Sequence, residues 1–199
     1  MITFTLAVFF LMITPGPGVM STAGVGSAFG FRAGLKYVLG LFIGTNIVAL
    51  CVITGLAAIL FSVPWVRWMA MGLSILYLLY LAARIALAGS KIAFIKATIA
   101  PGIGAGILLQ AINPKAYVVN ATLFTGFPFA PESLALETML KLLIANAIWI
   151  PIHFGWLWAG ASLHRLNLSD RAQRRINYAM AGAMLAVVAL ALLAGARQA

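Results

Sequence analysis

Long apolar runs dominate the chain, and polar residues fall mostly in the short gaps between them. A helix needs about 20 mostly apolar residues to span a membrane. The runs do not alternate strictly between apolar and polar residues, so we expect helices rather than strands. Six spans are predicted, at residues 4–28, 37–60, 66–87, 102–127, 140–163 and 176–193.

Two of these spans contain residues that interrupt a helix. The first contains Thr14-Pro15-Gly16-Pro17-Gly18, and the fourth contains Asn113-Pro114-Lys115-Ala116. Proline lacks the backbone N–H and clashes with the preceding turn, so a helix breaks or kinks there. Lys115 is the only formal charge between Lys96 and Glu132. Because a charge inside a membrane is costly, we expect this one to face protein or a water-filled cavity.

The interruptions recur at matching places in the two halves of the chain. Pro15 and Pro114 lie 99 positions apart, and Asn46 and Asn146 lie 100 positions apart. Three spans per half make the halves point in opposite directions through the bilayer. We therefore expect one transmembrane domain over residues 1–199, built from two inverted repeats at about 1–90 and 100–199. Paired broken helices in inverted repeats are typical of secondary transporters, although proline and glycine are also frequent in membrane helices generally.

Composition agrees with a membrane protein. The chain is 64% hydrophobic and 8% charged, whereas a soluble domain carries about 25% charged residues. The net charge of +10 comes from basic residues in the gaps, which argues for topology signals rather than nucleic-acid binding. The single Cys51 excludes an intrachain disulfide. No basic segment precedes the first apolar run, so we expect a retained span rather than a cleaved signal peptide.

The basic residues also predict the orientation, because cytoplasmic loops are enriched in lysine and arginine. Odd-numbered gaps hold nine of them and the other side holds three, so both termini are expected outside the cell. The nine are Arg32, Lys36, Arg84, Lys91, Lys96, Arg165, Arg171, Arg174 and Arg175, and the three are Arg67, Lys141 and Arg197.

Glycines spaced by four residues predict close helix packing. They are Gly26, Gly30 and Gly34, then Gly40 and Gly44, then Gly102 and Gly106. Together with the small face formed by Ala179, Ala183 and Ala186, these ladders would also permit a homodimer.

Several short motifs occur in a definite order along the chain. They are Pro15-Gly16-Pro17, Arg32-Ala33-Gly34, Gly40-Leu41-Phe42-Ile43-Gly44, Leu76-Tyr77-Leu78-Leu79-Tyr80-Leu81 and Asn113-Pro114-Lys115-Ala116. In their order and spacing the chain resembles the LysE/RhtB family of amino-acid exporters over essentially its whole length. The resemblance implies a bacterial inner-membrane exporter of amino acids or small derivatives, driven by the proton motive force without ATP. The chain has no Walker-type phosphate loop, and we expect no cofactor.

One departure from the family pattern bears on the substrate. Many relatives carry an acidic residue just after the second glycine of the second-span motif, where this chain has Thr45-Asn46. No Asp or Glu lies within any of the six predicted spans. Proton coupling would then use His153 or Lys115, and neutral substrates are favoured over cationic ones because a cation would need an anion as its partner.

The candidate substrate-binding residues lie at the breaks and at the paired asparagines. They are Pro15, Gly16, Pro17, Asn46, Asn113, Pro114, Lys115 and Asn146. Half-helices that restart after a break point free N–H groups at the cavity, which suits a substrate carboxylate. The alternatives are a packing kink with a lysine that snorkels to the interface, and asparagines that bridge helices for about 0.6 kcal/mol each.

His153 lies in the middle of the fifth span and is a candidate proton relay. The alternative is a histidine bonded to a neighbouring helix. Two other functions remain open at this point. A divalent-metal exporter would need clustered carboxylates, cysteines or histidines, and a membrane-embedded enzyme would need an acid/base pair. The expected partners are an amino-acid substrate and the lipid bilayer, with no metal bound.

Overall fold

The computed structural model describes residues 1–14, 16–87, 99–130 and 132–165, and, beyond these, positions 169, 171–172, 174–179, 181–182, 185–186 and 189. The predicted all-α class is confirmed over these residues. The third gap, at 88–98, and Ala183 of the small face lie outside them. The helices are α1 (Ile2–Ile13), α2 (Pro17–Ile53), α3 (Leu56–Ser62), α4 (Pro64–Ala86), α5 (Ile103–Ile112), α6 (Pro114–Thr125) and α7 (Leu134–Arg165).

Among the described residues, two helices are long and apolar enough to cross a membrane, at Pro17–Ile53 and Leu134–Leu163. Shorter apolar helices lie at Ile2–Ile13, Trp68–Ala83 and Ile103–Ile112. Large apolar side chains also cover the outside of the bundle, such as Ile2 at 77% exposure and Leu134 at 79%. An outer surface of this kind suits lipid rather than water.

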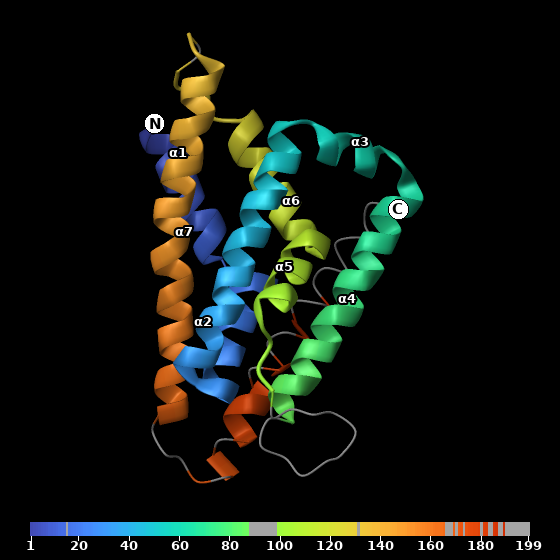
Figure 1. The fold of residues 1–199 in the computed structure, drawn as a ribbon, viewed down its shortest axis with the longest axis vertical. Coiled ribbons are helices and arrows are strands. Elements are labelled where there is room, and N and C mark those ends of the chain that lie inside the picture. Colours follow the sequence, from blue (N-terminus) through green and yellow to red (C-terminus); the bar gives the residue numbers. More distant parts are fainter. Residues whose placement is uncertain are drawn as a thin grey trace.

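Helix α2 is 37 residues long, but it turns back on itself at Gly30, whose φ of 78° and ψ of 175° are not helical. Tyr37 Oη donates a hydrogen bond to Ser21 Oγ at 2.9 Å. In a straight helix, residues 16 apart would be separated by about 24 Å. The two arms of α2 are therefore antiparallel, as the first two predicted spans require, and the turn lies at the end of the bundle away from the N-terminus (Figure 1). A glycine at this position adopts the positive φ without steric cost.

Both predicted helix breaks are present. α1 ends at Ile13 before α2 begins at Pro17, and α5 ends at Ile112 before α6 begins at Pro114. Each proline takes a first-turn position, where its missing N–H would have had no partner within the helix. The second break is capped, because Asn113 Oδ1 accepts a hydrogen bond from Lys115 N at 3.1 Å.

Two predicted boundaries are wrong. The second span stops at Ile53 rather than at residue 60, because Gly55 adopts a φ of 76° and separates α2 from α3. The short helix α3 then crosses the end of the bundle towards α4 (Figure 1). The fifth span begins at Leu134 rather than at residue 140.

The earlier start of α7 places Glu137 inside a helix that was expected to hold no acid. Glu137 Oε1 lies 2.8 Å from Lys141 Nζ, and both side chains are buried. Its Oε2 accepts hydrogen bonds from Phe129 N at 2.9 Å and Ala130 N at 2.7 Å. This carboxylate ties the α6–α7 loop to α7, and it lines neither of the cavities described below.

The predicted close packing at glycines is confirmed where α2 meets its two main neighbours. A Cβ at Gly40 or Gly106 would overlap the backbone of the facing helix at the contact between α2 and α5. Gly26 and Gly160 have the same role between α2 and α7. Gly30 instead makes the turn in α2, and a Cβ at Gly102 would meet nothing within 4 Å, so both glycines were wrongly assigned to the packing ladders.

Candidate functional site

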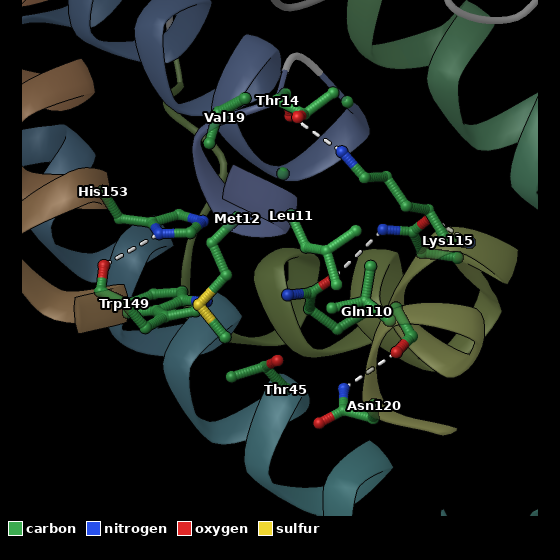
Figure 2. A pocket seen from close by; sticks show the side chains of 15 residues that line it. Leu11, Met12, Thr14, Val19, Thr45, Gln110, Lys115, Asn120, Trp149 and His153 are labelled. Carbon is green, nitrogen blue, oxygen red and sulfur yellow. Dashed lines mark hydrogen bonds between the residues drawn. The ribbon is translucent and has the colours of Figure 1, made fainter. Parts of the chain in front are cut away.

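The two helix breaks open onto one cavity. Its volume is about 60 Å³ for the centre of a water-sized sphere, and about 15 Å³ of such space holds one water molecule. Helices α2, α5, α6 and α7 and the end of α1 all contribute to its lining (Figure 2). The polar side chains that line it are Thr14, Thr45, Gln110, Asn113, Lys115, Asn120 and His153.

Lys115 connects the two breaks. Its Nζ donates a hydrogen bond to the carbonyl oxygen of Thr14 at 2.7 Å, across 101 positions of the sequence. Thr14 is the C-cap of α1, and the C-terminal end of a helix carries partial negative charge. The lysine therefore points across the cavity to the first break, as Figure 2 shows, and α1 supplies a counter-charge for it.

Gly16 makes room for this lysine. A Cβ at Gly16 would lie 2.8 Å from Lys115 Cδ and 2.9 Å from Lys115 Nζ. Such contacts are closer than real Cβ atoms make, so a larger residue would displace the lysine side chain. The glycine at the first break and the lysine at the second thus fit together as one unit.

The neutral amides beside Lys115 are engaged within the protein. Asn113 Nδ2 donates to Gln110 Oε1 at 3.2 Å, while its Oδ1 caps α6. Asn120 Nδ2 donates to the Ala116 carbonyl at 2.8 Å. All three side chains are buried. These bonds fix the three side chains beside the second break.

His153 is held by its own helix rather than by a neighbouring one. Its Nδ1 lies 3.0 Å from the Trp149 carbonyl oxygen, and its ring stacks on Trp149 with centroids 3.6 Å apart and an interplanar angle of 11°. A carbonyl oxygen only accepts, so we assign the proton of the neutral ring to Nδ1, which leaves Nε2 as an acceptor. A Cβ at Gly18, just after the first break, would lie 3.5 Å from this Nε2.

Asn46 and Asn146 bond to each other. Each Nδ2 donates to the other residue's Oδ1, at 3.0 and 2.9 Å. Asn46 Nδ2 also donates to the Phe42 carbonyl at 2.9 Å. In this structure the pair bridges α2 and α7, and it lines a smaller space of about 10 Å³ beside the main cavity. Thr45 and Trp149 line both spaces.

The structure therefore brings together four of the residues predicted from the sequence. Gly16, Asn113, Lys115 and His153 line the main cavity, and Pro17 and Pro114 set the helix starts beside it. Pro15 lies outside the described residues. Thr45, Gln110 and Asn120 also line this cavity but were not predicted as site residues. Trp149 lines it on the helix face that it shares with Asn146 and His153 at i, i+3 and i+7.

The model of the LysE type translocator family matches residues 9–196 of the chain. The chain belongs to the LysE type translocator family. Members of this family are membrane translocators that export amino acids or related compounds, and they are transporters rather than enzymes. No curated protein and no solved structure matches the chain significantly.

In this LysE type translocator, Thr45 bears on the charge of the cavity. It follows the second glycine of Gly40-Leu41-Phe42-Ile43-Gly44, where the family resemblance implies an acid in many relatives, and it lines the main cavity. Among the described lining residues of that cavity there is one lysine and no carboxylate. The described lining therefore carries one positive charge, from Lys115. An acid in place of Thr45 would neutralise it.

Proposed function

We propose that this chain is a secondary exporter of amino acids or small amino-acid derivatives in a bacterial inner membrane, driven by the proton motive force, with neutral substrates favoured. One observation carries the proposal. The two helix breaks meet at one cavity, where Lys115 Nζ reaches the end of α1 and the described lining holds no carboxylate.

A substrate carboxylate has a natural place in this cavity. The start of α2 lines this cavity at Gly18 and Val19, and the ammonium group of Lys115 lies beside the first break. At the start of α6 the N–H groups of Lys115 and Ala116 already bond to Asn113. Binding would exchange the bond between Lys115 and the Thr14 carbonyl for a bond to the carboxylate. Lys115 is charged in both bonds, but the carboxylate is an anion and the carbonyl is neutral, so the added Coulomb attraction favours the exchange.

The preference for neutral substrates follows from the same charges. A cationic side chain would enter a cavity that already holds Lys115, without an anion among the described lining residues. Glu137 is committed to Lys141. A divalent metal ion would meet the same lack of carboxylates, so metal export is the less favoured alternative.

For the transport cycle we propose that the two halves form inverted repeats with both termini outside the cell. The broken helices at Thr14–Gly18 and Asn113–Lys115 would then lie near the middle of the bilayer. Rocking of one half against the other would open the cavity alternately to each side.

The test is efflux of preloaded, radiolabelled neutral amino acids from cells that express the protein, with and without a protonophore. Lys115→Ala should lower efflux about tenfold, as loss of a charged hydrogen bond predicts. Lys36→Ala is the matched control, because Lys36 is exposed and lies far along α2 from the cavity. Equal efflux in the wild-type protein and Lys115→Ala for every substrate would reject the proposal.

A further inference from the structure

One buried nitrogen in the cavity has no hydrogen-bond partner among the described residues. His153 is 4% exposed, and its Nδ1 is held by the Trp149 carbonyl. No donor among the described residues bonds to its Nε2. Figure 2 shows this second ring nitrogen turned towards the side of the cavity from which Lys115 extends. A buried acceptor without a donor is costly, so this atom is suited to a donor that arrives with the ligand.

The surroundings of Nε2 define what this donor can be. On the α2 side Gly18 lies beside this nitrogen and has no side chain to cover it. Lys115 lines the same cavity from α6 and would occupy the carboxylate of a substrate. The remaining hydrogen-bonding group common to amino acids is the α-ammonium group, which only donates. Nε2 in the neutral ring only accepts.

We propose that His153 Nε2 accepts a hydrogen bond from the ammonium group of the transported amino acid, and that a proton competes with this group for the same lone pair. The inference rests on the proposed function and names the residue that would supply the missing acceptor. Lys115 then selects the carboxylate and His153 selects the amine. The site recognises a zwitterion although its described lining holds no acid.

Competition at one lone pair would couple export to proton entry. When Nε2 takes a proton from the outside, both ring nitrogens become donors and the ring becomes a cation. An ammonium group can no longer bond there and is repelled, so the amino acid leaves. Release of the proton to the cytoplasm restores the lone pair for the next substrate. Among the described lining residues, the other titratable side chain is that of Lys115 on α6. The lining residues that α1, α2 and α5 contribute do not titrate.

Direct binding to purified protein in detergent tests this inference. Radiolabelled L-leucine and L-threonine serve as probes, and 4-methylpentanoate and 3-hydroxybutanoate serve as competitors that lack the amino group. His153→Phe keeps a ring to stack on Trp149 but removes the acceptor. His153→Gln keeps an amide oxygen that can accept but does not titrate. His164→Gln is the control, because the sequence holds two histidines and both lie on α7.

Three results are expected. His153→Phe should weaken binding of the amino acids about tenfold or more, as loss of a charged hydrogen bond predicts, and leave competition by the deaminated acids unchanged. Wild-type protein and His164→Gln should lose amino-acid affinity as the pH is lowered from about 8 to below about 5, because protonation of Nε2 removes the acceptor. His153→Gln should bind the amino acids with little dependence on pH.

Two results would overturn the inference. One is equal weakening of amino acids and deaminated acids, or of neither, in His153→Phe. The other is a wild-type pH dependence in His153→Gln, which also decides the matter if the phenylalanine variant does not fold. Failure of the wild-type protein to bind either probe, together with absence of efflux in cells, would instead reject the proposed function itself.

Discussion

Replacing Asn46 and Asn146 by alanine, singly and together, should reveal a coupling free energy of about 1 kcal/mol between α2 and α7. The two amides exchange two hydrogen bonds of 3.0 and 2.9 Å. Interhelical hydrogen bonds in membranes contribute about 0.6 kcal/mol each on average and reach about 1.7. Two bonds of average strength therefore give about 1.2 kcal/mol, which a double-mutant cycle isolates from the effects of the single changes.

The structure also predicts which single variant is worse. Without Asn146, the Nδ2 group of Asn46 still donates to the Phe42 carbonyl at 2.9 Å. Without Asn46, both polar atoms of the Asn146 amide lose their described partner. A half-buried amide left without partners costs more than one that keeps a bond. Asn46→Ala should therefore destabilise the protein more than Asn146→Ala does.

The measurement is reversible unfolding in mixed micelles of mild detergent and dodecyl sulfate. Asn46→Ala combined with Ser162→Ala serves as the control cycle, because Ser162 lies 16 residues beyond Asn146 on α7, or about 24 Å along the helix. The control pair should be additive within about 0.3–0.5 kcal/mol. Equal additivity for the asparagine pair, or a larger effect of Asn146→Ala, would refute the reasoning.

Two further predictions concern the cavity itself. Gly18→Ala places a methyl group 3.5 Å from His153 Nε2, an ordinary contact that should preserve the fold but cover the acceptor and weaken binding of L-leucine about tenfold. Gly155→Ala is its control, since a Cβ there meets nothing within 4 Å, and equal binding by the two variants would contradict the prediction. Thr45→Asp adds a carboxylate to the cavity lining, so efflux of L-arginine should rise while efflux of neutral amino acids falls. Unchanged selectivity in this variant would show that the cavity charge does not select the substrate.

The helix breaks could be predicted from the sequence because proline and glycine act locally. Pro17 and Pro114 interrupt helices together with the extended Gly16 and the capping Asn113 before them. Pro151 lacks such neighbours and lies inside the continuous helix α7. The start of α7 could not be predicted in the same way. Glu137 reads as a loop residue until its partners are known, and those are Lys141 and two backbone N–H groups of the α6–α7 loop. Tertiary pairing of this kind makes burial of a carboxylate tolerable.

The candidate site shows the same division. The position of Lys115 beside a helix break is visible in the sequence, but its bond to a carbonyl 101 positions away is not. The orientation of His153 likewise depends on the backbone carbonyl of Trp149, which offers no signal in residue type. The sequence marked Thr45 only as the position at which an acid is absent, and it did not predict that Thr45 lines the cavity. Its role as a lining residue emerges once α2 folds back at Gly30 and returns past the first break.

The two breaks differ in a way that follows from their contact. Gly16 and Lys115 each come directly after the first proline of their break, Pro15 and Pro114, and they touch each other in the structure. A lysine at both places would bring two ammonium groups together in a cavity that its described lining leaves without an acid, and like charges at close range in a poorly solvated site repel strongly. A glycine at both places would leave the Thr14 carbonyl, and any substrate carboxylate, without a cation. With a glycine at the first break and a lysine at the second, the described lining carries a single positive charge. This charge matches the single carboxylate of a neutral amino acid.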